Sequence, residues 1–457
     1  MIDDLRTLSP GAPRGEPCTV ELDGETLRAF SGESLAVALF AAGIHTIGRS
    51  AKYHRPRGAF CFEGHCASCL LRVDGRPNVR ACQVPVREGL ACHSQNAFPT
   101  AEMDLLEAAD WLFPGGMDHH KMLTAHRAAN RLFLKVVREV GGSGRLPDAP
   151  AADLPPARRE TVDLCVVGGG PAGLTAAATV ARLAPGVRVL LVDDQDRPGG
   201  SWHALPGGSA RAAEVTARAE ASGVRILRRS AAIGFFPEDV DRAVMAATPD
   251  AIPGTLAVAT PEGLVRVTAR RLLYATGGYD QNVPFLDNDR PGVISARACG
   301  RLAFRHGVRP GTRVAVVGDG ALARALAANL AAAGVDAEAI DAAGETPVAV
   351  LGRGAVRGLR VAEPGGKERR VDADIIAVAA VPAPASELPR QHGAPVTFDE
   401  ARGGFAVTPD GSFRAAAGTA IFACGDVTGY RGPDAAAADA LLAGPIIAHT
   451  LTVPVTT

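Results

Sequence analysis

Residues 161–183 read TVDLCVVGGGPAGLTAAATVARL, and this stretch determines the fold of most of the chain. An apolar run enters the motif Gly168-Gly169-Gly170-Pro171-Ala172-Gly173, and an alanine-rich helical pattern follows it. The next apolar run, VRVLLVDD, ends on Asp193-Asp194. The glycines permit a tight turn and a close approach of backbone to a pyrophosphate, while the helix N-terminus faces the phosphates and an acid at the second strand's end can bind a ribose diol. The order therefore predicts a dinucleotide-binding fold, with Asp194 as its ribose acid.

A second copy of this pattern lies at residues 311–341. Gly318, Gly320 and Ala323 occupy its motif positions, and Asp341 is its terminal acid. Only AAGET separates Asp341 from the next strand pattern, PVAVLGRG, whereas a parallel crossover needs roughly 10 residues or more. We therefore expect a shortened second domain, which leaves two alternatives: it binds NAD, or it is purely structural. An acid at 341 without an adjacent arginine favours NAD over NADP if it binds.

Four ordered motifs resemble those of the two-dinucleotide flavoprotein superfamily. Besides the two glycine motifs, Ala275-Thr276-Gly277-Gly278 matches the segment between the two folds, and Gly425-Asp426 matches the late Gly-Asp pair. The resemblance implies FAD on the first fold, with Asp426 on its ribityl chain, and NAD(P) on the second. Thr276, Gly277, Gly200 and Ser201 are expected in the FAD site. The alternative is an alanine-rich doubly wound domain with incidental glycines.

A cysteine-rich segment, CFEGHCASC at residues 61–69, lies outside these folds. Cys61, Cys66 and Cys69 have the C-x4-C-x2-C spacing of plant-type [2Fe-2S] proteins, and Cys82 can supply the remote fourth ligand. Zinc normally uses two CxxC or Cys/His pairs, and only one CxxC is present. The spacing favours the cluster, with zinc and inert thiols as alternatives. The five other cysteines lie singly in apolar or strand contexts, which is typical of buried small side chains.

The segments around these cysteines predict a small ferredoxin-like domain of the β-grasp type at residues 1–100. Asp23-Gly24 and Asp74-Gly75 each separate two extended runs, which indicates two hairpins. Ser31 is a candidate N-cap for a helix between them. Residues 101–160 form a connector with a helix over HHKMLTAHRAANRLFLKVVREV and a Gly/Pro-rich linker. The fold class is thus α/β, with FAD-binding segments at 161–295 and 390–457 and a shortened NAD-binding-like domain at 296–389.

Composition excludes several classes of protein. With 48 basic and 49 acidic residues among 457, the net charge is near zero, so nothing indicates nucleic-acid binding. The first residues, MIDDLRTLSP, lack the features of a signal peptide, and no apolar run approaches the roughly 20 residues of a spanning helix. We expect a cytoplasmic protein without a transmembrane segment.

Residues 48–90, GRSAKYHRPRGAFCFEGHCASCLLRVDGRPNVRACQVPVREGL, resemble the small [2Fe-2S] subunit of hydrogen cyanide synthase and of the opine and hydroxyproline dehydrogenases. The flavoprotein half resembles their FAD-binding subunit, and both halves together resemble the start of the alpha chain of sarcosine oxidase. All four cluster cysteines match. The chain lacks the further cysteine cluster of many middle subunits and the folate-binding domain of the sarcosine oxidase alpha chain, so folate-linked chemistry is not expected.

The family resemblance implies an electron-transfer subunit. In that family a partner flavin subunit of the amino-acid-oxidase type oxidises the amine or imino acid, and the chain resembling this one passes the electrons to an acceptor. No motif supplies a proton-abstracting base, so the catalytic residues stay unassigned. An NADH-dependent flavin/[2Fe-2S] reductase is the alternative, and a structural subunit with vestigial sites is a third hypothesis. NAD and an additional FMN at a subunit boundary remain open.

Overall fold

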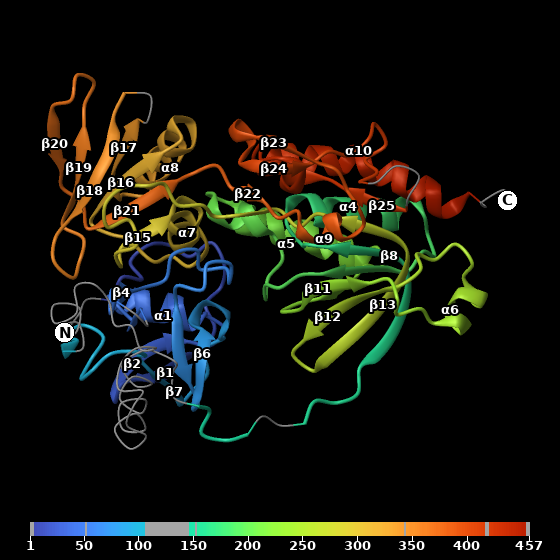
Figure 1. Cartoon of the computed structure of the whole chain (residues 1–457), viewed down its shortest axis with the longest axis horizontal. Coiled ribbons are helices and arrows are strands. Elements are labelled where there is room, and N and C mark those ends of the chain that lie inside the picture. The colour runs from blue at the N-terminus through green and yellow to red at the C-terminus, as the bar shows by residue number, and fades with distance from the viewer. Residues whose placement is uncertain are drawn as a thin grey trace, which may run out of the picture. The chain divides into compact units, whose positions relative to one another are not determined.

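The computed structural model describes residues 4–50, 53–105, 146–150, 153–341, 344–415 and 420–453 (Figure 1). The chain forms two compact units. Unit 1 consists of Met1–Ala151 and Asn282–Ala379, and unit 2 consists of Ala152–Gln281 and Ala380–Thr457. The helix expected within the connector lies outside the described residues.

The first part of unit 1 is a five-stranded sheet of order β2-β1-β7-β5-β6 with one helix, α1. Both predicted hairpins are present, because Asp23-Gly24 and Asp74-Gly75 adopt the positive φ values that a two-residue hairpin turn requires. The parallel pairing of β1 with β7 closes the sheet. The elements are β1 (Pro17–Leu22), β2 (Glu25–Phe30), α1 (Leu35–Ala41), β3 (Gly48–Arg49), β4 (Pro56–Arg57), β5 (Leu70–Val73), β6 (Arg76–Arg80), η1 (Ala81–Gln83) and β7 (Leu90–His93).

The start of α1 differs from the expectation. Ser34, not Ser31, is the N-cap, and its side chain accepts a hydrogen bond from the Val37 N–H. Glu33 lies before the helix, where its carboxylate forms a buried ion pair with Arg6, 2.7 Å from Nη2. This tertiary pairing holds residues 31–33 outside the helix.

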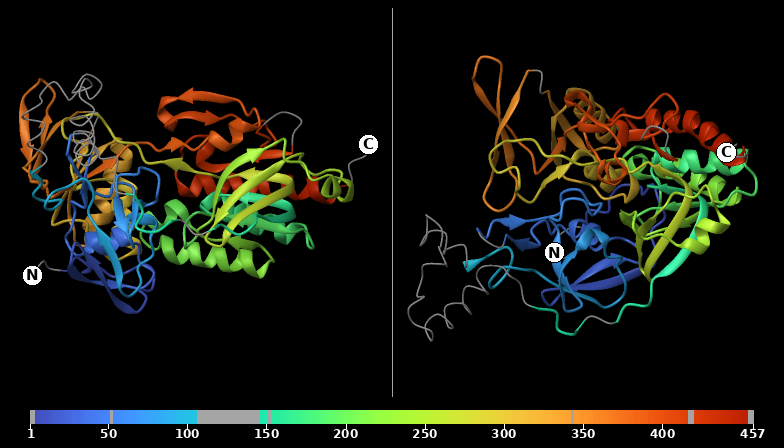
Figure 2. Two further views of the ribbon diagram at one scale, coloured as in Figure 1. Left: turned by 60° about the horizontal axis from the view of Figure 1, so that its bottom comes forward. Right: turned by 45° about the vertical axis from the view of Figure 1, so that its right-hand side comes forward.

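The second part of unit 1 is a parallel sheet of order β15-β21-β16-β17. The strand that follows β17 along the chain, β18, joins a separate antiparallel sheet with β19 and β20, drawn in orange in Figure 2. β18 therefore does not extend the parallel sheet. The elements are β15 (Val293–Ser295), α7 (Ala296–Gly300), the π-helix η4 (Arg301–Arg305), β16 (Arg313–Gly318), α8 (Gly320–Ala332), β17 (Asp336–Asp341), β18 (Thr346–Leu351), β19 (Gly358–Ala362), β20 (Glu368–Val371) and β21 (Ile375–Ala379).

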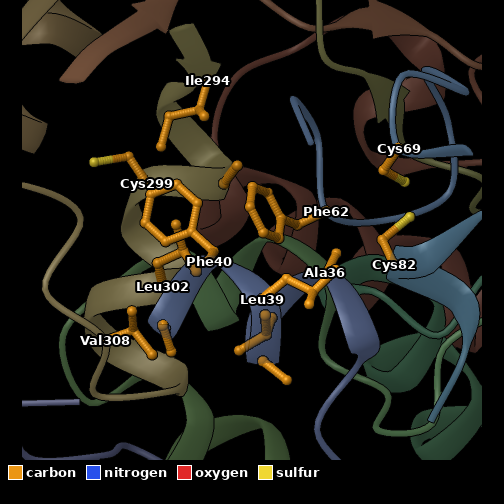
Figure 3. Packing of buried hydrophobic residues seen from close by; sticks show 14 of the residues in the cluster. Ala36, Leu39, Phe40, Phe62, Cys69, Cys82, Ile294, Cys299, Leu302 and Val308 are labelled. Carbon is orange, nitrogen blue, oxygen red and sulfur yellow. The ribbon is translucent and has the colours of Figure 1, made fainter. Parts of the chain in front are cut away.

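The two parts of unit 1 share one hydrophobic core. Phe40 and Phe62 from the ferredoxin-like part lie beside Cys299 and Leu302 of α7 and η4 (Figure 3). The two phenylalanine rings meet edge to face at 5.6 Å between centroids. Each buried large apolar side chain contributes about 1.5–3 kcal/mol. The ferredoxin-like part thus shares its core with residues that lie beyond the expected boundary at residue 100. The expected break at 295/296 would also remove β15 from its own sheet.

Unit 2 contains a seven-stranded sheet of order β10-β9-β8-β13-β12-β11, with β25 also paired to β13. The pairs β8–β9, β9–β10, β8–β13 and β13–β25 are parallel. The carboxyl ends of these strands therefore lie at one edge, where a doubly wound sheet binds its ligand. The strands are β8 (Arg158–Val167), β9 (Val189–Val192), β10 (Arg225–Leu227), β11 (Ala231–Phe236), β12 (Thr255–Thr260), β13 (Gly263–Tyr274) and β25 (Ile421–Ala423).

Helices α4, α5 and α10 contribute to the core on one face of this sheet. Leu164 and Val166 of β8 face that core, whereas Cys165 and Val167 face a second one, which explains the uninterrupted apolar run. The remaining elements are α4 (Pro171–Leu183), η3 (Gly200–Ala204), α5 (Gly208–Ala221), α6 (Arg242–Ala247), β14 (Gly278–Tyr279), β22 (Ala383–Pro384), α9 (Glu387–Gln391), β23 (Val396–Asp399), η5 (Glu400–Arg402), β24 (Gly404–Val407), η6 (Gly425–Thr428) and α10 (Pro433–Thr452).

Helix α10 corrects the expectation about apolar segments. It has 20 residues, and an 18-residue window within it has a mean hydropathy of 1.3, so it is long and apolar enough to cross a membrane by length and composition. Ala440, Ala443 and Ile447 are buried in the core that α10 shares with α4. A Cβ at Gly444 would lie 2.6 Å from Thr179 Cγ2. These contacts account for the composition of α10 as that of a core helix.

Candidate cofactor sites

The first candidate site is the cluster loop, residues 58–69, together with Cys82 on η1. Cys61, Cys69 and Cys82 are buried, and Cys66 is half-buried. Phe62, Gly64 and Ala67 adopt positive φ, so the loop coils tightly between the cysteines. As a result the Glu63 N–H points to Cys61 Sγ at 3.4 Å and the Gly64 N–H to Cys82 Sγ at 3.1 Å.

The four thiols are linked by hydrogen bonds in the order Cys66, Cys61, Cys82, Cys69. Hydrogen bonds from Cys66 and Cys82 lower the pKa of Cys61, and a hydrogen bond from Cys82 lowers the pKa of Cys69. The pKa values of the two donor thiols change in the opposite direction. The hydrogen bond to Cys61 raises the pKa of Cys66, and the hydrogen bonds to Cys61 and Cys69 raise the pKa of Cys82. Two of the four sulfurs are therefore already biased toward the thiolate that metal ligation requires.

This donor set fits a [2Fe-2S] cluster. A two-iron cluster uses four cysteine sulfurs, two for each iron, and is tuned by hydrogen bonds to sulfur. Here the sulfurs are linked pairwise, and two backbone N–H groups point at them. Among the described residues, no three His, Cys, Asp or Glu side chains are grouped around one metal position. His65 lies exposed between two of the cysteines.

The second candidate site is the phosphate loop of unit 2, residues 168–173, between β8 and α4. Gly170 is the N-cap of α4, has no side chain to cap the helix, and is followed by Pro171 at the first turn. A Cβ on Gly170 would meet no protein atom within 4 Å. The first N–H groups of a 13-residue helix are thus accessible beside open space, as an anion site requires.

The other glycines of the loop are needed for packing. A Cβ on Gly168 would lie 2.3 Å from Ala275 O, and one on Gly173 would lie 1.8 Å from Gly168 O. Gly168 also has a φ of +102°, which favours glycine. These contacts hold β8, α4 and the end of β13 together at the carboxyl edge of the sheet.

Three more predicted segments lie beside the phosphate loop. A Cβ on Gly200 would be 3.0 Å from Gly170 Cα, and Ser201 follows Gly200 in η3. A Cβ on Gly425 would be 2.6 Å from Ala172 Cβ, which brings buried Asp426 to the first turn of α4.

The segment after β13 completes the group. Thr276 Oγ1 donates to Ala385 O at 2.7 Å, and Gly277 O accepts from the Ala385 N–H. The positions predicted for FAD are thus gathered at one edge of unit 2, and the open cradle at Gly170 fits a pyrophosphate.

Asp193 and Asp194, at the end of β9, have different roles. Asp193 is buried, and its carboxylate accepts from the Gly169 N–H at 2.6 Å and from the Gln195 N–H at 3.0 Å. Asp194 is half-buried and accepts from Gln195 Nε2. Asp193 therefore shapes the phosphate loop, which leaves Asp194 as the candidate for the ribose.

The second glycine motif is built differently. Asp319 is the N-cap of α8, and its carboxylate accepts from the N–H groups of Ala321 and Leu322. A pyrophosphate would need these donors and would meet a negative charge at the same place. Gly318 and Asp341 are paired in register at the ends of β16 and β17, and Gly320 begins α8. The arrangement disfavours NAD on the second fold.

The remaining thiols are free and buried, as expected. Burial raises the pKa of Cys92, Cys165 and Cys424 to about 12 in each case, so these thiols stay protonated near neutral pH.

A further buried polar pair was not anticipated. The Tyr274 hydroxyl lies 2.7 Å from His392 Nε2. Burial lowers the pKa of His392 to about 4 and raises that of Tyr274. Both groups are therefore neutral at pH 7.

Sequence reasoning missed four residues at these sites. Asp319 could have been found, because an acid before a helical pattern is a common N-cap. Asp193 was recognised only as half of an acid pair. Arg301 and Glu63 carry no local signal, because they meet only in the folded chain, where Arg301 Nη1 is 2.9 Å from Glu63 Oε1.

Two protein families match separate parts of the chain. Residues 15–97 match the 2Fe-2S iron-sulfur cluster binding domain, and residues 162–353 match the pyridine nucleotide-disulphide oxidoreductase family. These matches confirm the predicted fold class and an oxidoreductase with a 2Fe-2S part and a flavoprotein-type part.

Several characterised proteins are similar. The alpha chain of sarcosine oxidase from Rhizobium meliloti is 34% identical over 72% of this chain, which spans 34% of that relative's length. HcnA of Pseudomonas aeruginosa hydrogen cyanide synthase is 37% identical over 17% of this chain and 74% of HcnA. One of the opine oxidase subunits of Rhizobium meliloti is 31% identical over 44% of this chain and 45% of its own length.

A solved structure extends the likeness of fold over almost the whole chain. L-proline dehydrogenase from P. horikoshii superposes with a TM-score of 0.71 and 22% identity, over 98% of this chain and 76% of that one.

Proposed function

We infer the function of this chain from its family: the chain belongs to the family of the sarcosine oxidase alpha chains, the HcnA subunits of hydrogen cyanide synthase and the related opine oxidase subunit. The relatives named as subunits belong to enzymes of several chains. On this basis the present chain is a subunit of a heteromeric amine or imino-acid dehydrogenase, and it relays electrons from a partner flavin subunit of the amino-acid-oxidase type to an acceptor.

One observation carries this proposal: a single chain contains both an open phosphate cradle at Gly170 and a loop with four adjoining thiols. A bound flavin accepts two electrons as a hydride, and an iron-sulfur cluster passes electrons on singly. The protein's own part is to bind and orient these groups. The N-terminus of α4 would hold the pyrophosphate of FAD, Asp194 the ribose and Asp426 the ribityl chain. Cys61, Cys66, Cys69 and Cys82 would ligate the cluster.

The substrate class follows from the relatives' names. Sarcosine is an N-methyl amino acid, and opines are secondary amines. A glycine-like, N-alkyl or imino-acid substrate is therefore expected, oxidised at the partner's flavin. FMN at a subunit boundary would belong to the assembled complex.

The alternative function is an NADH-dependent reductase that feeds the cluster directly. The second glycine motif favours it, whereas the carboxylate cap of Asp319 opposes it. The two functions separate in one experiment. The isolated chain and the co-purified complex are each given NADH or a panel of amines anaerobically, and reduction of flavin and cluster is followed by absorbance and EPR. Rapid reduction by NADH without any response to amines in the complex would establish the reductase instead.

A further inference from the structure

The cluster loop is held by an arginine from the other part of unit 1. Arg301 is the first residue of η4, and its side chain is only 3% exposed. Its Nη2 donates to the carbonyl oxygen of Cys61 at 2.6 Å. Its Nη1 lies 2.9 Å from Oε1 of Glu63, whose side chain is 12% exposed. The buried guanidinium of Arg301 therefore contacts both the backbone of Cys61, a predicted cluster ligand, and the carboxylate of Glu63, two residues further along the chain.

The position of Arg301 is fixed by packing outside the cluster loop. The Ser295 N–H donates to Phe60 O at 3.0 Å, which ties the start of the loop to β15. Leu302, next to Arg301, lies in the core with Phe62, as Figure 3 shows. Arg57 pairs with Asp289 at 2.9 Å and adds a second attachment nearby. The second nucleotide-like fold thus holds the guanidinium of Arg301 in a fixed position.

The electrostatic effect of such a pair can be derived. Reduction of a cluster adds one negative charge, so a nearby cation raises the reduction potential and a nearby anion lowers it. Both effects are strong where water is excluded. With both partners present the two effects oppose each other, and removal of either side chain takes away one of them.

We propose that Arg301 and Glu63 form a charge pair that sets the reduction potential of the cluster, and that Arg301 is the positioning residue that joins the cluster loop to the second nucleotide-like fold. This inference rests on the proposed function, because it needs the cluster to be bound. It also gives the second fold a role that does not require NAD.

The test is a potentiometric titration of the reduced-cluster EPR signal in the full chain. Arg301→Met should shift the midpoint potential to more negative values, because a positive charge beside the cluster loop is lost. Glu63→Gln should shift it to more positive values. The double variant should fall between the two single variants. Shifts of the same sign in both single variants would overturn the proposal, since a loosened loop has no reason to respond to the sign of the removed charge.

Two further variants make the result independent of folding defects. Arg301→Lys keeps the charge and should restore most of the potential that Arg301→Met loses. Arg313→Met removes an exposed arginine, 56% exposed and paired with Asp372 in the same part of unit 1, and should leave the potential unchanged. If Arg301→Met does not retain iron, the sign of the Glu63→Gln shift and the Arg301→Lys potential decide, and an unshifted Glu63→Gln variant contradicts the proposal. A wild-type chain without iron would refute the proposed function itself.

Discussion

At the scale of single residues, cluster ligation depends on sulfur. Anaerobically purified protein should contain two iron and two sulfide per chain, and Cys66→Ser or Cys69→Ser should abolish the reduced-state EPR signal, because a hydroxyl does not replace a thiolate. Cys92→Ser is the matched control. Cys92 is buried on β7 of the ferredoxin-like sheet, donates to Glu21 O, and lies outside the cluster loop. Its signal should stay unchanged. Zinc as the sole metal found would contradict the assignment.

Gly170 offers a sharp test of the flavin site. Because a Cβ there meets no protein atom, Gly170→Val should fold normally yet lose the yellow chromophore, since the side chain fills the space for the pyrophosphate. Gly411→Val is the control, because Gly411 also has open space around its Cβ position. FAD content after gel filtration is the measurement, and stoichiometric FAD in Gly170→Val would show that the site lies elsewhere.

Asp426 tests the late Gly-Asp pair. Asp426→Ala should weaken FAD binding by loss of a charge-assisted hydrogen bond, worth about 1.5–3 kcal/mol or roughly tenfold to a hundredfold in Kd. Titration of the apoprotein with FAD, followed by flavin fluorescence, measures this change. An unchanged Kd would mean that Asp426 does not contact the flavin.

Single residues also show where sequence reasoning succeeds. The glycines at 168, 170 and 173 were assigned correctly to a strand–turn–helix junction, because their spacing reports backbone geometry directly. The assignment of Ser31 as the N-cap was wrong, because Arg6 holds Glu33 outside the helix and the helix begins after Ser34. Such a contact between residues 27 positions apart leaves no local pattern.

At the scale of elements, the N-terminus of α8 distinguishes the two nucleotide-like folds. Wild-type protein should show no saturable NADH binding by fluorescence titration, because Asp319 occupies the helix donors. Asp319→Ala should lower the free energy of unfolding by about 1 kcal/mol through loss of the cap. Asp319→Asn keeps a capping oxygen and should lose less. Tight NADH binding by the wild type would contradict the structural interpretation of this fold.

The contact between β13 and the segment after α9 predicts a pH dependence. His392 is neutral in the folded protein, with a pKa of about 4, whereas in the unfolded chain it is protonated below about pH 6.5. The unfolded state therefore binds more protons between these values, and stability should fall as pH decreases from about 6.5 to 4. With a discount for partial exposure, we expect a loss of about 1–2 kcal/mol. His392→Gln, which does not titrate, should lack this component in urea unfolding curves.

Both hairpins and the βαβ order were predictable at this scale, because their signals are local. The pairing of β18 with β19 and β20 in a sheet of their own was not, since a short apolar strand has no signal for its partner. The short segment after Asp341 indicated only that a crossover was missing.

At the scale of the whole molecule, the sequence identified the parts but not their grouping. It separated the ferredoxin-like part from the second nucleotide-like fold, whereas unit 1 joins them through one hydrophobic core. The apolar residues of α7 and η4 could equally pack inside one domain or between two domains, so their sequence does not show which elements they contact. The role of Arg301 could not be predicted from the sequence, because its partners in the cluster loop are about 240 residues away.

We infer that this chain relays electrons and does not itself oxidise the amine. The most direct measurement is the EPR signal of the reduced cluster after anaerobic addition of an amine such as sarcosine, an opine or proline, in the isolated chain and in the complex with its co-purified flavoprotein subunit. We expect a substrate-dependent signal in the complex and none in the isolated chain. A signal from the isolated chain with an amine, or one that appears only with NADH in either preparation, would contradict it.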